Sequence, residues 1–411
     1  MTRRILAFQP WDDGSHRAVR RSIERHASFV WSWRTLPGRG PRWRLRHAAL
    51  RFADTLRNEP TSALDEIDAI HATSMLSMSD LRATVPAGLR NRPFILSMHE
   101  NQIAYPTGDA TRARDRERDA HLAFTNLASI EAADRVVWNS RWNRDSFIDG
   151  MLAMLRHAPE RVDRGWVERL ETKSTVVPPP IEFEEIQAAA PAVGPSIVLH
   201  NTEIAEDSGV GESSVRGRST RVIRPIRVVW PHRWEHDKGV DELLDLADEA
   251  WAREQRGGPA IRWILLGQRF GEVPSAIETL LTRHADRIEH VGSVPRPEYL
   301  TWLHRADWVL STARHEFFGM AVAEALVAGC LPWLPDRLSY PELVPPEVFG
   351  WNPWTVETPA PASIARISGS IPGGIGRIRG LITDRLAAAE AGVAVGRLED
   401  VIEDAIRSAN A

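Results

Sequence analysis

The chain has 411 residues, enough for two domains of roughly 150–200 residues each. Its apolar fraction of 43% and charged fraction of 26% are ordinary for a globular protein, and its net charge of −4 does not by itself indicate a nucleic-acid partner. No apolar run reaches the roughly 18 residues of a membrane helix, and the single cysteine, Cys330, excludes an intramolecular disulfide and a cysteine zinc site. We therefore expect a cytoplasmic protein without a membrane partner.

The first half of the chain alternates apolar runs with helical patterns. The opening run, MTRRILAFQP, is too short for a signal peptide and is interrupted by Trp11, Asp12 and Asp13, so it predicts a β-strand. Further strands are predicted within residues 28–33, 66–74, 93–100, 134–140 and 174–180. Alternation of strand and helix is typical of a parallel sheet covered on both faces, and we predict one such domain in residues 1–182.

The loop after the first strand contains Gly14, Ser15 and His16, which open a helix. Glycine permits close backbone approach, and the first N–H groups of a helix bind anions or sugar oxygens. An ordinary helix cap, with Ser15 near the helix start, explains the same residues, and taken alone the loop favours this simpler interpretation.

Arginine is concentrated in residues 1–60, which hold thirteen arginines, no lysine and five acidic residues, a balance of 13 − 5 = +8. Tryptophans are interleaved, and Arg42 and Arg44 flank Trp43. Arginine with aromatic side chains suits phosphate contact and base stacking, so this segment is a candidate nucleic-acid surface. A solvated face in an arginine-rich proteome is the alternative interpretation.

Four polar residues directly follow the apolar run FILSM, namely His99, Glu100, Asn101 and Gln102. Ligands of parallel sheets bind beyond the carboxyl ends of the strands, so this cluster is a candidate for catalysis or for acceptor contact. A single histidine in such a place is more often structural. The next strand is also followed by polar residues, among which Ser140 is predicted to be a helix N-cap.

The second half follows a break in the pattern. Residues 183–224 are increasingly small and polar, which predicts a variable, partly disordered insertion between domains. Residues 225–385 are predicted to form a second domain of βα units, and residues 386–411 a helical tail. The strands of this second domain are predicted within residues 226–230, 261–267, 287–294, 308–313 and 330–335.

Two cations and two carboxylates stand out in the second domain. Arg233 and Lys238 follow the buried strand IRVVW and precede a helix start, a setting that suits a diphosphate better than it suits two surface cations. Glu316 lies in the loop HEFFG, and Glu324 lies inside the apolar helix that follows, with seven residues between them. Carboxylates that bind sugar hydroxyls, next to cations that bind phosphate, are the groups expected of a nucleotide-sugar site. Gly267 permits backbone to approach a nucleotide or simply forms a turn.

The Arg/Lys pair and the spaced Glu pair resemble retaining glycosyltransferases of family 4, which have the GT-B fold of two Rossmann-like α/β domains facing each other across a cleft. Four further sequence motifs, WPHRWEHDK, HEFFGMAVAEA, MHENQIAYP and GSH, resemble those of a narrower group, the tRNA-queuosine α-mannosyltransferases. The resemblance runs from residue 1 to about residue 345. One departure is Asp13, which stands where the family word Gly-Gly-Ser-His has its first glycine.

The resemblance implies transfer of mannose, with retention, from GDP-mannose to queuosine in the anticodon loop of a tRNA of the aspartate type. It implies four catalytic residues: His99 beside the donor sugar, Glu316 on its hydroxyls, and Arg233 and Lys238 on the diphosphate. The remaining expected donor contacts are Gly14, Ser15, Gly267, Phe318, Gly319 and, on the ribose, Glu324. The expected acceptor contacts are Glu100, Asn101, Gln102, Arg42 and Arg44.

No cofactor and no metal are expected, because fixed cations neutralise the diphosphate and no carboxylate cluster has metal spacing. Two alternatives remain open. One is a family 4 enzyme with another nucleotide sugar and a small-molecule or lipid acceptor. The other is a tRNA-binding protein that has the fold without catalysis.

Overall fold

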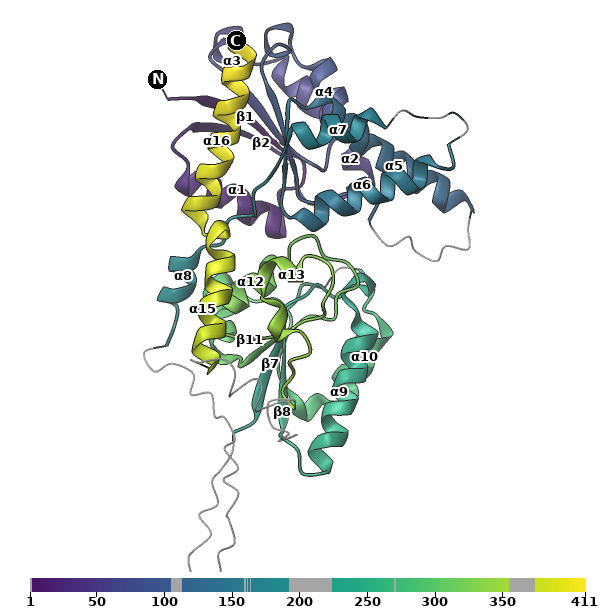
Figure 1. Cartoon of the computed structure of the whole chain (residues 1–411), viewed down its shortest axis with the longest axis vertical. Coiled ribbons are helices and arrows are strands. Elements are labelled where there is room, and N and C mark those ends of the chain that lie inside the picture. The colour runs from purple at the N-terminus through teal and green to yellow at the C-terminus, as the bar shows by residue number, and fades with distance from the viewer. Residues whose placement is uncertain are drawn as a thin grey trace, which may run out of the picture.

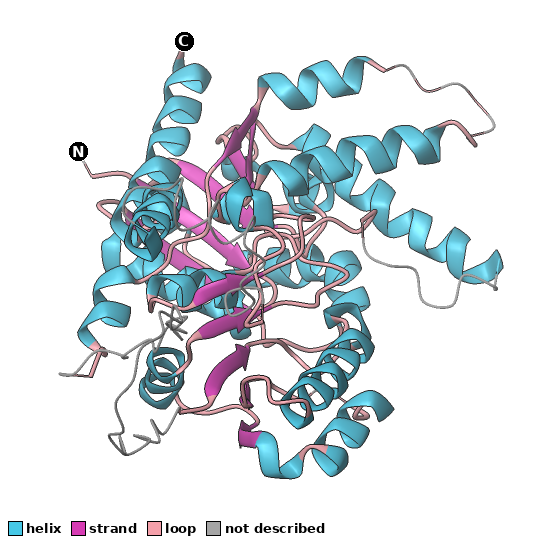
Figure 2. Cartoon of the chain, turned by 60° about the horizontal axis from the view of Figure 1, so that its bottom comes forward, coloured by secondary structure: helices cyan, strands magenta, loops and turns pink. Residues whose placement is uncertain are grey.

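The computed structural model describes residues 2–104, 113–158, 160, 162, 164–191, 224–269, 271–354 and 374–411. These residues form two α/β domains, each with helices packed on both faces of a parallel sheet (Figure 1; Figure 2). The architecture confirms the predicted pair of Rossmann-like domains.

The first sheet has six parallel strands in the order β2-β1-β3-β4-β5-β6. Its strands are β1 (Arg4–Gln9), β2 (Val30–Thr35), β3 (Ala69–Thr73), β4 (Phe94–Met98), β5 (Arg135–Trp138) and β6 (Ser174–Val176). The helices between them are α1 (Gly14–His26), α2 (Pro41–Leu56), α3 (Thr61–Asp65), α4 (Met78–Thr84), α5 (Ala113–Ala132), α6 (Arg141–Leu155) and α7 (Gly165–Thr172). Each strand predicted in this half is confirmed, with shifts only at its ends.

The second sheet has five parallel strands in the order β11-β10-β7-β8-β9. Its strands are β7 (Ile226–Trp230), β8 (Ile261–Leu265), β9 (Ile288–Val291), β10 (Trp308–Leu310) and β11 (Leu331–Trp333). Its helices are α8 (Phe183–Ala188), α9 (Val240–Gln255), α10 (Ser275–Arg283), α11 (Arg296–Arg305), α12 (Met320–Val327), α13 (Tyr340–Leu343) and α15 (Gly374–Leu386), and the chain ends with α16 (Ala391–Asn410). A short 3-10 helix, His236–Lys238, precedes α9.

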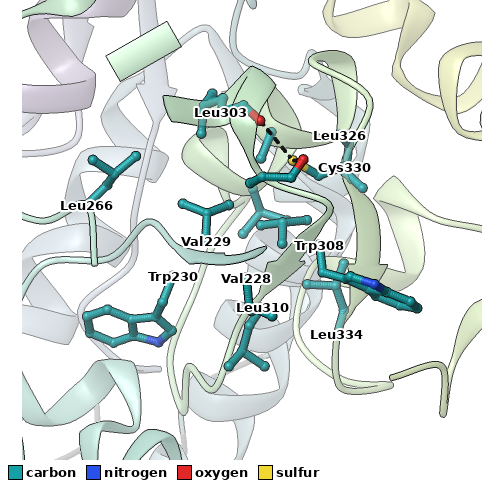
Figure 3. Close-up of a cluster of buried hydrophobic side chains, with 14 of the residues drawn as sticks. Val228, Val229, Trp230, Leu266, Leu303, Trp308, Leu310, Leu326, Cys330 and Leu334 are labelled. Carbon is teal, nitrogen blue, oxygen red and sulfur yellow. Dashed lines mark hydrogen bonds between the residues drawn. The ribbon is translucent and has the colours of Figure 1, made fainter. Parts of the chain in front are cut away.

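Central strands of both sheets are mainly apolar because helices cover them on both sides. All five residues of β3 and of β4 are buried, whereas the edge strand β2 is only partly covered. In the second domain, Val228, Trp308 and Leu310 belong to one cluster of buried side chains (Figure 3). Cys330 lies in the same core and donates a hydrogen bond from Sγ to the Leu303 carbonyl at 3.4 Å (Figure 3).

The predicted helical tail is helical, and its last helix belongs to the core of the first domain. Val395, Leu398 and Ile402 of α16 pack against Ile5 and Val137 of the first sheet, and α16 lies beside α1 in the first domain (Figure 1). Its polar face is anchored as well, since Arg3 pairs with a carboxylate of α16 at 2.8 Å. The chain therefore returns from the second domain to cover the outer face of the first.

The predicted insertion begins with an ordered helix. Phe183 and Ile186 of α8 pack in the core of the second domain, and His304 Nε2 hydrogen-bonds the Ile186 carbonyl at 2.7 Å. Residues 192–223, which make up most of the predicted insertion, lie outside the described residues.

Candidate active site

The two domains meet through loops at the carboxyl ends of their strands. Ser140 Oγ donates a hydrogen bond across the junction to the Phe317 carbonyl at 2.5 Å. The same oxygen accepts from Asn143 N at 2.9 Å, which confirms Ser140 as the N-cap of α6. Glu342, from α13, accepts from the N–H groups of Arg141 and Trp142 at 3.0 and 2.8 Å. A carboxylate of the second domain therefore completes a helix N-terminus of the first.

Lys238 is buried in the second domain and contacts three oxygen atoms. Its side chain is only 8% exposed. Nζ donates to the His315 carbonyl at 2.8 Å and lies 3.2 Å from Asp237 Oδ2 and 3.4 Å from Glu316 Oε2. The following Gly239 has φ +67°, and a Cβ there would lie 2.1 Å from the Thr312 carbonyl oxygen. Only glycine allows this turn, which brings Lys238 to the loop that carries Glu316.

Glu316 remains ionised beside this cation. Burial acts to raise the pKa of Glu316, but Lys238, His232, His315 and Arg233 outweigh it and leave the pKa below its ordinary value. The loop then enters α12 through Gly319, which has φ +89°. The helix α12 therefore starts directly after the loop that carries Glu316, as the sequence predicts.

Arg233 is the more accessible cation. Its side chain is 46% exposed, and its guanidinium lies 3.1 Å from Glu235 and 3.9 Å from Asp237. Arg233 also contributes to lowering the pKa of His16, which belongs to the other domain. The second domain's exposed cation thus faces the first turn of α1.

His16 and His99 form the first domain's side of the junction. Their rings contact edge to face, with centroids 5.0 Å apart. Burial is the main cause that lowers the pKa of His16 to about 3 and that of His99 to about 4, so both rings are neutral at pH 7. His99 is thus placed with the predicted donor cations and uncharged, which allows it to act as a hydrogen-bond donor or acceptor.

The loop before His16 accommodates Asp13 in place of the family glycine. Asp13 has an extended backbone, with φ −150°, and its carboxylate accepts from Gly14 N at 2.9 Å as the N-cap of α1. A Cβ at Gly38 would lie 2.5 Å from Asp13 Cβ, so glycine at 38 makes room for this side chain. Gly14 and Ser15 are exposed in the first turn, and the cap is Asp13 rather than Ser15.

An asparagine network holds the loop that carries His99. Asn139 Nδ2 donates to the His99 carbonyl at 2.8 Å, and Asn143 Nδ2 donates to Asn139 Oδ1 at 2.8 Å. Asn101 is fully buried and donates to both the carbonyl and the side chain of Asn143 at 2.9 Å. This burial gives Asn101 a structural role in place of the predicted acceptor contact. Glu100 and Gln102 are partly exposed and bond each other at 3.0 Å.

Glu324 has partners that the sequence analysis missed. Its Oε1 accepts from Arg296 at 2.6 Å and its Oε2 from the Tyr299 hydroxyl at 2.9 Å. Arg296 also reaches Glu185 of α8 at 3.2 Å. No local pattern identifies these partners, because they lie on α11, a separate helix. Each carboxylate oxygen keeps a second lone pair, so a ribose hydroxyl can still bind.

Several other predicted site residues serve the fold. A Cβ at Gly267 would lie 1.9 Å from the His232 carbonyl oxygen, so the close approach that this glycine permits is to the protein's own backbone. The Phe318 ring is buried in the second core. Arg44 is buried and donates to the Pro37 carbonyl at 3.0 Å, which removes it from a phosphate-binding surface. Arg42 lies in α2, but its side chain is outside the described part of the structure.

Within the described ranges, no group of three or more His, Cys, Asp or Glu side chains could hold a metal ion. A search of the same residues finds no helix both long and apolar enough to cross a membrane.

Comparison with known proteins identifies the family. A family profile described as "tRNA-queuosine alpha-mannosyltransferase N-terminal" matches residues 4–181, and one described as "Glycosyl transferases group 1" matches residues 219–368. A tRNA-queuosine alpha-mannosyltransferase from Drosophila melanogaster is 30% identical over 84% of this chain and 82% of that protein. The chain belongs to the tRNA-queuosine α-mannosyltransferase family.

This tRNA-queuosine α-mannosyltransferase family member is a glycosyltransferase with the GT-B fold. It is also 26% identical over 133 residues to a GDP-mannose:cellobiosyl-diphosphopolyprenol alpha-mannosyltransferase from Xanthomonas campestris, which covers 32% of this chain and 33% of that protein. Solved structures share the fold at low identity. The N-terminal domain of Candida albicans trehalose-6-phosphate phosphatase has TM-score 0.64 at 11% identity, covering 99% of both chains. Sucrose-phosphate synthase from Thermosynechococcus elongatus has a TM-score of 0.61 at 14% sequence identity, covering 99% of this chain and 100% of that one.

Proposed function

We propose that this protein transfers mannose from GDP-mannose to queuosine in a tRNA anticodon loop, with retention of anomeric configuration, in the cytoplasm. The Drosophila relative is named for the queuosine reaction and the Xanthomonas relative for GDP-mannose. The observation that carries the proposal is the contact of Lys238 with Glu316, beside Arg233, on the side of the second domain that faces His16. Phosphate-binding cations and a sugar-binding carboxylate thus occupy one site.

The cations act on the leaving diphosphate. As the bond between the anomeric carbon and the phosphate oxygen lengthens, negative charge grows on the diphosphate and positive charge on the sugar ring. Arg233 is exposed enough to bind a phosphate oxygen directly, while Lys238 is fixed by three protein oxygens and adds a preorganised charge. These groups supply the positive charge without a metal.

The carboxylates and the histidine orient the donor. Glu316 is ionised and accepts hydrogen bonds from sugar hydroxyls, and Glu324 accepts from the ribose. Neutral His99 lies at the reacting carbon on the side of the first domain. The helix N-terminus at Gly319 adds N–H donors for the diphosphate.

The decisive experiment is incubation with GDP-mannose and queuosine-containing tRNA, followed by nucleoside mass spectrometry. We expect one added hexose on queuosine and none on the same tRNA carrying guanosine. UDP-glucose is the donor control. Hexose from UDP-glucose only, or tRNA binding without transfer, would replace the proposal with one of the two alternatives.

A further inference from the structure

A cavity of about 40 Å³ lies inside the first domain, at the carboxyl ends of its central strands. Its walls come from β1, β2, β3, α1, α16, the prolines at 178–180 and the loops after β4 and β5. His99 is part of the wall, so the cavity adjoins the proposed reaction centre. The groups proposed to hold the donor diphosphate and ribose belong to the other domain and do not fill this space.

Two hydrogen-bonding atoms of the wall have no partner within the described residues. His71 is 1% exposed; its Nε2 bonds Ser97 Oγ at 2.8 Å, and its buried Nδ1 has no partner. Trp33 also lines the cavity, and its Nε1 is buried without a partner. The two rings lie edge to face, with centroids 6.1 Å apart. Since an unsatisfied buried polar group is costly, the pair points to a ligand that completes both bonds.

Charge narrows the chemistry of that ligand. Burial is the main cause that lowers the pKa of His71 to about 3 and that of His99 to about 4, so neither ring is charged at neutral pH. Arg20, at the cavity wall, already binds Asp12 at 2.8 Å and Glu24 at 2.6 Å. A neutral wall favours a hydroxyl over a phosphate, because a buried anion would lack a counter-charge.

The volume of the cavity further restricts which ligand can bind. One water needs roughly 10–15 Å³ of such space, so about 40 Å³ admits only a few non-hydrogen atoms. A whole nucleobase is excluded, whereas one edge of a small hydroxylated ring fits. A hydroxyl both donates and accepts, so it can bond the Trp33 N–H and, in either tautomer, His71 Nδ1.

We propose that this cavity receives a hydroxyl-bearing edge of the acceptor nucleoside, with Trp33 and His71 as its hydrogen-bond partners. This inference rests on the proposed function, which makes a hydroxylated modified nucleoside the acceptor. Guanosine at the same tRNA position has hydroxyls on its ribose but none on its base, so its base presents no such group to the cavity. Trp33 and His71 are therefore specificity-determining residues that select modified over unmodified tRNA.

The test compares Trp33→Phe with Trp31→Phe. Both changes remove one indole N–H and keep an aromatic ring on β2, and the two rings stack 5.4 Å apart. Trp31 Nε1 donates to Glu399 at 3.4 Å, and Trp31 is not among the residues that line the cavity. We expect Trp33→Phe to lower kcat/KM for queuosine-containing tRNA roughly 10-fold. Its affinity for unmodified tRNA and for GDP should be unchanged, and Trp31→Phe should keep the wild-type preference for modified tRNA.

A second variant fills the cavity without removing a polar group. Ala394 of α16 is 2% exposed and lines the cavity, so Ala394→Val occupies part of the space. We expect the folded protein to bind GDP normally and to lose transfer to queuosine-containing tRNA at least as severely as Trp33→Phe.

The outcomes separate the two hypotheses. If the wild type transfers normally and both cavity variants keep its preference for modified tRNA, the cavity holds only water and the inference is overturned. Equal weakening of modified and unmodified tRNA overturns it too, since that marks a structural role. If the wild type transfers nothing to queuosine-containing tRNA, the proposed function fails, and the cavity assignment falls with it.

Discussion

Lys238 Nζ lies 3.4 Å from Glu316 Oε2, although the two residues are 78 positions apart in the chain. The contact joins the cationic loop after β7 to the acidic loop after β10, which are neighbouring strands of the sheet. In the proposed function, this contact lets one set of groups hold both the donor sugar and its diphosphate.

Breaking this pair should cost both stability and activity. Lys238→Met leaves the partly buried Glu316 without its main cation. We expect the free energy of unfolding to fall by about 2–3 kcal/mol, less than for a fully buried ion pair, because Glu316 is partly exposed. The double variant Lys238→Met, Glu316→Gln should recover most of that stability and remain inactive. Urea denaturation and the transfer assay measure the two effects. A single variant that is as stable and active as the wild type contradicts the assignment.

The buried histidines predict lower stability in mild acid. The pKa of His71 is about 3 in the folded protein and about 6.5 when unfolded, so below pH 6.5 the unfolded state binds the extra proton. The contribution of His71 to the free energy of unfolding is therefore fully present above pH 6.5. It falls as the pH drops toward 3, by up to about 1.4 kcal/mol per pH unit for this one group. His71→Gln should flatten the slope of urea midpoints between pH 7 and 5. His47→Gln, which changes a partly exposed histidine of α2, is the matched control.

The contact of Glu342 with α6 can be used to test whether the junction between the two domains is closed in solution. Glu342→Gln removes the charge that accepts from Arg141 N and Trp142 N, so the first turn of α6 should exchange its amide hydrogens faster. We expect several-fold faster exchange there and a higher KM for the donor. Glu347→Gln, which changes an exposed carboxylate further along the chain, should alter neither. Unchanged exchange in Glu342→Gln means that the junction is open in solution.

Variants of Glu324 and of its partner Tyr299 distinguish two roles. One role is binding of the ribose by the Glu324 carboxylate, and the other is support of that carboxylate by Tyr299. Glu324→Gln should weaken GDP binding by about 1.5–3 kcal/mol, the range for a hydrogen bond to a charged group. Tyr299→Phe removes one donor to Oε2 and keeps the charge, so its effect on GDP affinity should be smaller. Calorimetry with GDP decides, and equal affinity in the wild type and Glu324→Gln rules out the ribose role.

The tRNA-binding surface should lie on the exposed side of α2. Trp43 is 73% exposed, and Arg46 and Arg51 are also exposed, whereas Arg44 is buried. Charge reversal of Arg46 and Arg51 should weaken tRNA binding and spare GDP binding. It should also reduce the log–log salt slope by about 0.7 for each single-strand phosphate that the variant no longer neutralises. Trp43→Ala should cost about 1–3 kcal/mol if a base stacks on it. A salt series with no slope removes this surface from tRNA binding.

The sequence by itself determined the α/β class and the strand positions. Buried parallel strands are nearly continuous apolar runs, a property that each segment carries locally, so β4 and β7 are visible as FILSM and IRVVW. The Lys238 and Glu316 motifs are local too, because each lies in the segment between a strand and the next α-helix.

Tertiary structure alone decided which side chains reach the site. Asn101 and Arg44 follow the expected patterns, yet both are buried, because residues far along the chain supply the groups around them. Glu324 receives Arg296 and Tyr299 from another helix, and α16 returns to cover the first sheet. The cavity at His71 and Trp33 combines strands, α1 and α16. Sequence periodicity determines the direction of a side chain within its own element, but burial and partners depend on contacts between distant segments, which no local pattern contains.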